Sequence, residues 1–199
     1  MIILDVETTG IDPLRHSLVA IAALDFDDPE ERFFEECKIW EGAEIDEKAL
    51  IINGLSPEEL VYDEKKTEAD IVQNFIDWVC TRRDTTIGGQ NPFFDVSFIN
   101  AAAERAGKTS PLHHRTVDMH TLAWAHMQKR GLVPPVNDKK HSDLGSDAIM
   151  TYVGLPPEPK PHVGLNSPVW ECEAIHRLLF NKTKLEEFEK YPIPWHNEA

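Results

Sequence analysis

An apolar strand pattern with two acids in alternation, at residues 2–9, limits the folds open to this chain more than any other segment. Alternate residues of a strand point to the same face, so Asp5 and Glu7 share one face while Leu4 and Val6 occupy the other. The apolar flanks indicate that this strand is buried.

Two neighbouring carboxylates on a buried strand repel each other and lose solvation, which costs free energy unless a cation lies between them. A divalent ion bound by Asp5 and Glu7 would offset that cost, and oxygen ligands suit Mg²⁺ or Mn²⁺. The spacing alone agrees equally well with a strand that ends in water and carries two solvated acids.

The rest of the chain alternates strand and helix patterns, which predicts an α/β fold, a mixed β-sheet flanked by helices. Further strands are expected at 17–26, 31–40, 85–88 and 115–118, and helices at 46–55, 67–80, 94–107, 119–130, 143–153 and 168–181. Thr67 is the expected N-cap of its helix. Because the Pro-rich loops at 131–141 and 155–166 interrupt this pattern without dividing it, we expect residues 1–199 to form a single domain.

The composition narrows the function classes. A formal net charge of −15 disfavours tight binding to long duplexes, since phosphate binding usually needs a basic surface. No apolar run reaches the roughly 18 residues of a membrane span, and the strand next to Met1 leaves no room for a cleaved presequence. Three scattered cysteines form no disulfide or zinc pattern, so we expect buried thiols and a cytoplasmic protein.

The string from Leu4 to Pro13, LDVETTGIDP, resembles the first motif of the DnaQ-like (DEDDh) 3′→5′ exonucleases of the RNase H-like superfamily. The match combines the strand, the pair of acids and the Thr8-Thr9-Gly10 turn with the downstream Asp12-Pro13. The resemblance implies that Asp5 and Glu7 bind metal and that Thr8 and Thr9 contact the substrate.

The run from Ile87 to Asp95 resembles the second motif of the same family, although Gln90 stands where histidine is usual. Asp95 at a helix start also has a simple interpretation, a favourable interaction with the helix N-terminus. The resemblance implies that Asp95 supports a second metal ion through water and that Asn91 steadies the site or the substrate. Phe94 is expected to contact the terminal nucleotide.

The third motif of the family, a histidine followed about five residues later by an aspartate, is only half present. His162 matches the histidine, but Ser167 stands at the aspartate position and, with Pro168, is expected to begin the last helix as its N-cap.

Either of two glutamates on the last helix is a candidate replacement for the missing aspartate. Glu171 lies four residues beyond Ser167 and shares a stripe with Ile175 and Leu178, whereas Glu173 is expected to form a solvated pair with Arg177. We therefore favour Glu171, while Glu173 or no replacement remains open.

These residues predict a metal-dependent 3′→5′ exonuclease that hydrolyses DNA or RNA from the 3′ end to nucleoside 5′-monophosphates. Asp5, Glu7, Glu171 and Asp95 would hold two Mg²⁺ (or Mn²⁺) ions, and His162 would act as general base, with activity rising as it deprotonates. The expected partner is a nucleic acid 3′ end and not a membrane, and the sequence leaves a homodimer open.

Two other functions remain as alternatives to the exonuclease. The first is a catalytically weakened nucleic-acid-binding module on the same fold, because the third-motif aspartate is missing. The second is a phosphodiesterase acting on small nucleotides, which the acidic composition also fits.

Overall fold

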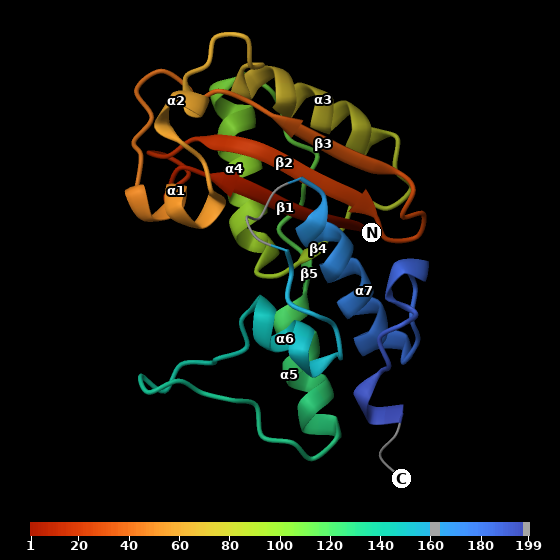
Figure 1. The fold of residues 1–199 in the computed structure, drawn as a ribbon. Coiled ribbons are helices and arrows are strands. Elements are labelled where there is room, and N and C mark those ends of the chain that lie inside the picture. The colour runs from red at the N-terminus through yellow and green to blue at the C-terminus, as the bar shows by residue number, and fades with distance from the viewer. Residues whose placement is uncertain (160–163, 197–199) are drawn as a thin grey trace.

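The computed structural model describes residues 1–159 and 164–196. Its centre is a five-stranded sheet in the order β3-β2-β1-β4-β5 (Figure 1). The strands are β1 (Ile2–Thr8), β2 (Leu18–Asp25), β3 (Arg32–Glu36), β4 (Ile87–Gly89) and β5 (Thr116–Asp118). The first three pair antiparallel, whereas β4 and β5 add in parallel, so the sheet is mixed as the sequence predicts.

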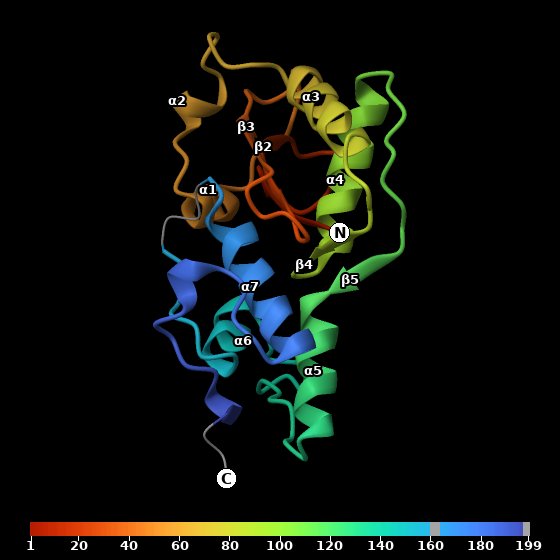
Figure 2. The same cartoon turned by 90° about the vertical axis from the view of Figure 1, so that its right-hand side faces the viewer.

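Helices cover both faces of the sheet (Figure 2). In the described part of the chain they are α1 (Glu47–Asn53), α2 (Pro57–Leu60), α3 (Glu68–Cys80), α4 (Pro92–Arg105), α5 (Met119–Lys129), α6 (Ser146–Tyr152) and α7 (Asn166–Phe180), followed by 3-10 turns at Glu186–Phe188 and Pro194–His196. Helices α3 and α4 lie on one face, and α7 packs on the other beside α5 and α6.

The alternation along β1 decides which side chains meet which helices. Leu4 and Val6 belong to the core under α3 and α4, whereas Ile3 belongs to the core formed with α5, α6 and α7. Asp5 and Glu7 share the face of Ile3, so they point toward the α7 side of the sheet. The predicted sharing of one face by the two acids is therefore confirmed.

Most predicted elements are present, two helices begin at other residues than expected, and one short helix was not predicted. Helix α4 begins at Pro92 because proline suits the first helical position, where its missing N–H is not needed. Helix α7 begins at Asn166 with Leu165 as its N-cap, so the prediction that Ser167 caps this helix is wrong. The short α2 was not predicted, although the Ser56–Glu59 capping box marks it.

The prediction that Glu173 and Arg177 form a solvated pair is wrong, because both side chains are 0% exposed. Arg177 donates to Glu173 at 2.7 Å, and its remaining donors reach backbone oxygens of Val153, Phe188 and Tyr191. Glu173 also accepts from the backbone N–H groups of Lys184 and Leu185. The segment after α7 folds back over this pair and buries it, which helical periodicity alone does not reveal.

Replacing Arg177 by Met should lower the free energy of unfolding by about 3–5 kcal/mol, because it leaves the Glu173 carboxylate buried without its cation. Urea unfolding followed by circular dichroism measures this. The matched control is Arg82→Met, which removes an arginine from a more exposed ion pair with Glu31 and should cost at most about 1 kcal/mol. Equal losses in the two variants would contradict the assigned role of the buried pair.

The cysteines are free, and two of them, Cys37 and Cys172, are buried as expected. Cys80 is exposed, which corrects the expectation for that residue; it is the last residue of α3. Within residues 1–159 and 164–196, no helix has the length and apolar character needed to cross a membrane.

Candidate active site

A pocket of about 220 Å³ lies where β1 meets α7, and acidic side chains dominate its lining. Its lining residues are Asp5, Glu7, Ile52, Gln90, Ser146, Glu158, Ser167 and Glu171. Four of these eight are carboxylates, and none of the eight, all in the described part of the chain, is basic. The structure therefore brings Glu171 together with the first-motif acids, whereas Glu173 is taken up by Arg177.

Asp95 lies behind the pocket, in the first turn of α4, and is 4% exposed. The parallel pairing of β1 with β4 ends at Ile3 and Gly88, and beyond that point the Val6 N–H donates to Asp95 Oδ1 at 3.0 Å. Burial, together with the nearby charge of Asp5, raises the pKa of Asp95 well above its usual range, although the Val6 hydrogen bond opposes this. This carboxyl group is thus enclosed beside β1 and electrostatically coupled to Asp5.

Glu171 is 4% exposed, and its Oε2 has no hydrogen-bond partner among the described residues. A side chain at Gly89 would not fit here, because its Cβ would lie 2.9 Å from Glu171 Oε2 and 3.0 Å from the Leu4 carbonyl oxygen. The glycine lets the carboxylate approach the backbone between β1 and β4. Burial, Asp5 and Asp95 raise the pKa of Glu171 well above its usual range.

The ionised form of Glu7 is destabilised in the same way. Burial raises its pKa to about 8, and the charges of Asp5 and Glu158 contribute in the same direction. Three acids with raised pKa values in one site mean that their ionised forms are destabilised and that a cation would relieve the destabilisation.

The donor set suits hard divalent ions such as Mg²⁺ or Mn²⁺, since every candidate ligand is a carboxylate oxygen. Among the residues that the structure describes, no three Asp, Glu, His or Cys side chains already stand in a metal-binding arrangement. The orphaned Glu171 Oε2 and the raised pKa values are the observations that support a cation here.

Glu158 was missed by the sequence reasoning. It is 4% exposed, lines the pocket and accepts a hydrogen bond from Ser167 Oγ at 2.7 Å. Its surroundings in the sequence are a proline-rich loop without periodicity, so no pattern marked it for burial. Ser167, at the position of the missing aspartate, thus brings another carboxylate into the pocket.

Both threonines of the first motif are buried, and the Thr8 hydroxyl bonds within the turn whereas the Thr9 hydroxyl bonds outside it. Thr8 Oγ1 donates to the Gly10 carbonyl at 2.7 Å. Thr9 Oγ1 donates to the Glu44 carbonyl at 2.7 Å and accepts from the Ser17 N–H at 2.9 Å. Their side chains shape the turn that follows β1.

Asn91 and Phe94 lie in a second pocket, of about 330 Å³, lined by Ile11, Pro13, Asn91, Phe93, Phe94, Ser97 and Phe98. Asn91 adopts a left-handed conformation (φ 54°), and its N–H donates to Asp118 Oδ1 at 3.2 Å. Phe94 packs on Phe98 with ring centroids 4.9 Å apart, while Phe93 is 63% exposed. This apolar pocket shares α4 with Asp95.

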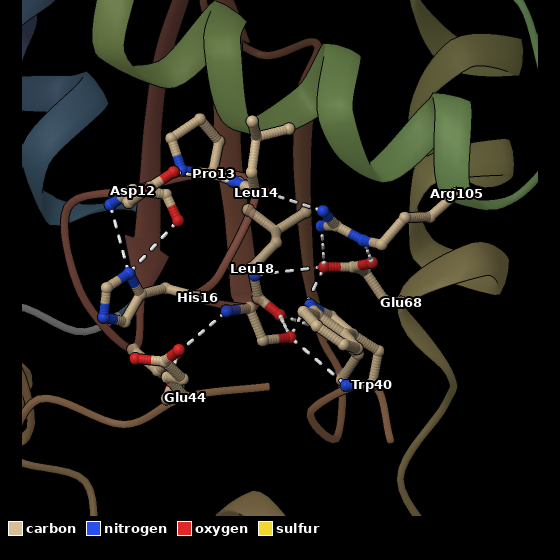
Figure 3. Close-up of polar contacts among 12 residues, drawn as sticks. Asp12, Pro13, Leu14, His16, Leu18, Trp40, Glu44, Glu68 and Arg105 are labelled. Carbon is tan, nitrogen blue, oxygen red and sulfur yellow. Dashed lines mark hydrogen bonds and ion pairs between the residues drawn. The ribbon is translucent and has the colours of Figure 1, made fainter. Parts of the chain in front are cut away.

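The Gly10–His16 loop that supplies Ile11 and Pro13 is held from behind by Arg105 (Figure 3). Arg105 donates to the Pro13 carbonyl at 2.7 Å and pairs with buried Glu68 through two hydrogen bonds of 2.8 and 2.9 Å. Glu68 in turn accepts from the Leu18 N–H at 3.1 Å. The loop therefore rests on a network that joins α3, α4 and β2.

A larger cavity of about 620 Å³ borders this network and includes Trp40, Val61, Ala102 and the Glu68–Arg105 pair in its lining. Its buried carboxylate, that of Glu68, is paired with Arg105. The smaller pocket is the candidate active site, because it brings the first-motif acids Asp5 and Glu7 together with Glu171. His162, the expected general base, lies outside the described residues.

Comparison with known proteins identifies the family. Residues 2–165 match the RNase T family, whose description is exonuclease. The chain belongs to this exonuclease family. The predicted membership of the DnaQ-like, RNase H-like group is thereby confirmed.

Relatives of this exonuclease family member include two bacterial enzymes named ribonuclease T. The one from Haemophilus influenzae is 32% identical over 131 residues, covering 56% of this chain and 55% of that protein. The one from Marinobacter nauticus is 32% identical over 138 residues, covering 61% of this chain and 62% of that protein. The matched part is thus somewhat more than half of each relative.

Solved structures confirm the fold. A product-bound exonuclease I matches 91% of this chain with a TM-score of 0.71 at 17% identity, and E. coli exonuclease I with a dA16 oligonucleotide matches 91% with 0.70 at 18%. This chain spans less than half of those longer proteins, 43% of the first and 40% of the second. The RNase H-like mixed sheet with flanking helices is therefore the observed architecture.

Proposed function

We propose that this chain is a metal-dependent 3′→5′ exonuclease that hydrolyses phosphodiester bonds of DNA or RNA. The observation that carries the proposal is the convergence of Asp5, Glu7 and Glu171 on one pocket, with Asp95 behind them, in a member of an exonuclease family. These are the carboxylates that the family motifs and helical geometry select in the sequence.

Asp5 and Glu7 from β1, Glu171 from α7 and Asp95 from α4 would hold two Mg²⁺ or Mn²⁺ ions. Exonucleases of this kind are metal-dependent in general. Bound divalent ions would supply Lewis-acid stabilisation of the scissile phosphate and activation of the attacking water. The residues of the chain hold their carboxylates in a partly dehydrated pocket, where electrostatic interactions are stronger than in water.

The apolar pocket around Phe94 is the proposed place of the terminal nucleotide. Phe93 and Phe94 offer aromatic faces on which a base can stack, and Asn91 lies at the same helix start. Structures of the related exonuclease I contain dA16 and dT13 oligonucleotides, which supports a nucleic acid strand as the substrate.

His162 is the proposed general base, which takes the proton of the attacking water when its imidazole is neutral. This role rests on the sequence motif. It predicts that activity rises with pH as the imidazole loses its proton.

A second candidate, a phosphodiesterase for small nucleotides, is favoured by one observation. The net charge of −15 provides little attraction for a long phosphate backbone. Mononucleotide esters and oligonucleotides of increasing length separate the two candidates, because only an exonuclease gains activity from a polymeric strand.

The deciding assay is digestion of 5′-labelled single-stranded DNA and RNA with Mg²⁺ or Mn²⁺. We expect a ladder that shortens from the 3′ end and a loss of at least about 1,000-fold, or ~4 kcal/mol, in Asp5→Asn. In His162→Asn, the remaining activity should lose its rise with pH. No digestion by the wild type with either metal would move the assignment to a nucleic-acid-binding module, and full activity of His162→Asn would remove that residue as the base.

A further inference from the structure

Arg105, the last residue of α4, reaches the loop at residues 10–16, which forms part of the apolar pocket proposed for the terminal nucleotide. We propose that Arg105 is a positioning residue for substrate recognition. It fixes this loop across the pocket from Phe94, so that the pocket is shaped to take the base of the 3′-terminal nucleotide. The inference rests on the proposed function and adds to it a residue that acts through the loop.

The apolar pocket has two walls, which come from distant parts of the sequence. Ile11 and Pro13 of the loop form one wall, and residues of α4, among them Phe93 and Phe94, form the other. Ile11 is 81% exposed and Phe93 is 63% exposed, so both walls leave apolar surface open to solvent. Exposed apolar side chains grouped around a hollow are typical of a ligand site, and a nucleobase suits them because its faces can stack.

The tip of this loop has few ties to the rest of the molecule. In the described part of the chain, residues 11–14 form hydrogen bonds only within the loop, with one exception. The exception is the Pro13 carbonyl oxygen, which accepts from Arg105 Nη1 at 2.7 Å (Figure 3). The end of the loop is tied separately, through the ion pair of Arg15 with Glu44. Arg105 is therefore the residue that holds the tip.

Arg105 is itself held by several contacts, so it can hold the loop in a fixed position. Its Nε and Nη2 donate to the carboxylate of Glu68 at 2.9 and 2.8 Å, which leaves Nη1 for the loop. Glu68 is buried and also accepts from the Leu18 N–H at the start of β2. The guanidinium carbon lies 5.2 Å from the centroid of the Trp40 ring. A planar guanidinium fixed by a carboxylate presents its remaining donor in one direction, which the single ammonium group of a lysine cannot reproduce.

The test is steady-state digestion of two single-stranded oligonucleotides, one with a normal 3′-terminal nucleotide and one whose 3′-terminal nucleotide is a stable abasic analogue. Arg105→Lys keeps a cation beside Glu68 but loses the contact with Pro13. We expect KM for the normal oligonucleotide to rise by about 5–10-fold, the factor that one net hydrogen bond contributes, with kcat within about two-fold of the wild type. For the abasic oligonucleotide, KM should be the same in both proteins, because there is no base for the pocket to hold.

The matched control is Arg82→Lys, because Arg82 makes similar contacts away from the pocket. It donates to Glu31 at 2.8 Å, and its guanidinium carbon lies 5.0 Å from the centroid of the Trp78 ring. None of these three residues lines the apolar pocket. This variant should digest both oligonucleotides with the kcat and KM of the wild type.

Trypsin cleavage after Arg15, in the same loop, is a measurement that needs no enzymatic activity. We expect cleavage there to be about 5-fold faster in Arg105→Lys than in the wild type, since cleavage follows the population of the locally opened loop. Arg82→Lys should be cleaved at the wild-type rate. If Arg105→Lys does not fold, the double variant Glu68→Gln with Arg105→Gln replaces it, because removing both charges leaves no unpaired buried carboxylate, and the same results are expected.

The outcomes distinguish this inference from the proposed function. An unchanged KM for the normal oligonucleotide in a folded variant, or an equal rise in KM for both oligonucleotides, would overturn the role of Arg105 and leave the exonuclease intact. A wild type that digests both oligonucleotides with equal KM would overturn the base pocket and this inference together. A wild type that digests nothing overturns both the inference and the proposed function.

Discussion

Glu171→Gln should reduce exonuclease activity by at least about 100-fold, or ~2.7 kcal/mol, while making the metal-free protein more stable. The activity falls because an amide oxygen is a weaker ligand for a hard cation than a carboxylate. The stability rises because glutamine removes a buried charge that burial, Asp5 and Asp95 destabilise. We expect a gain of about 0.5–2 kcal/mol at pH 8, the range common for single stabilising substitutions.

The matched control for this prediction is Glu173→Gln, two residues along the same helix. Glu173 is fully paired with Arg177 and backbone N–H groups, so its replacement should destabilise the fold and leave the activity of the folded fraction intact. Urea unfolding in EDTA and oligonucleotide digestion with Mn²⁺ measure the two effects. Activity that survives in Glu171→Gln would remove Glu171 from the site, and lowered stability would show that its carboxylate is compensated within the protein.

In the absence of divalent ions, the thermal midpoint of the protein should fall as the pH rises from about 4.5 to 8. The pKa of Glu7 is raised from 4.5 to about 8, and those of Asp95 and Glu171 are raised too, so the folded state binds more protons than the unfolded state in this range. Stability is then fully present below the unfolded pKa values and is lost as the pH passes through the folded ones. At about 1.4 kcal/mol per pKa unit, the effect amounts to a few kcal/mol.

Differential scanning calorimetry between pH 4.5 and 8.5 checks this dependence, with an expected fall of at least about 5 °C in EDTA. Saturating Mn²⁺ should largely remove the fall, because an ion that binds only the folded state raises its stability by mass action. The variant Glu7→Gln should show a shallower slope, since it lacks one of the titrating groups. An equal slope with and without Mn²⁺ would contradict a cation site formed by these carboxylates.

The first two motifs could be located from the sequence because they are local. Asp5 and Glu7 lie two residues apart on a strand, so strand alternation places them on one face, and Asp95 lies in the first turn of a helix that the second motif marks. Helical spacing also placed Glu171 on the core-facing stripe with Ile175 and Leu178, and all three are buried. Strand alternation and helix caps are properties of neighbouring residues, so they can be predicted without knowing the fold.

Burial of polar groups required the tertiary structure. Arg177 was predicted to be solvated, but it donates to the Val153 carbonyl at the end of α6 and to two carbonyls, of Phe188 and Tyr191, in the segment that folds back after α7. Whether a polar side chain is buried depends on segments distant in sequence, and no periodicity records where those segments pack. The same reason accounts for the enclosed hydroxyl of Thr9, which bonds to residues far along the chain from it.

The sequence by itself indicated most of the strands and helices along the chain and the motifs that resemble the family, because strand alternation, helical periodicity and motif spacing involve residues close together in the sequence. Only the tertiary structure showed which groups surround the acids at and near the incomplete third motif. In the folded chain Glu171 lies against Gly89, and Glu173 pairs with Arg177. Glu158, from a proline-rich loop, accepts a hydrogen bond from Ser167. The physical reason is that a carboxylate's role depends on which distant groups surround and desolvate it, and the folded chain sets those surroundings.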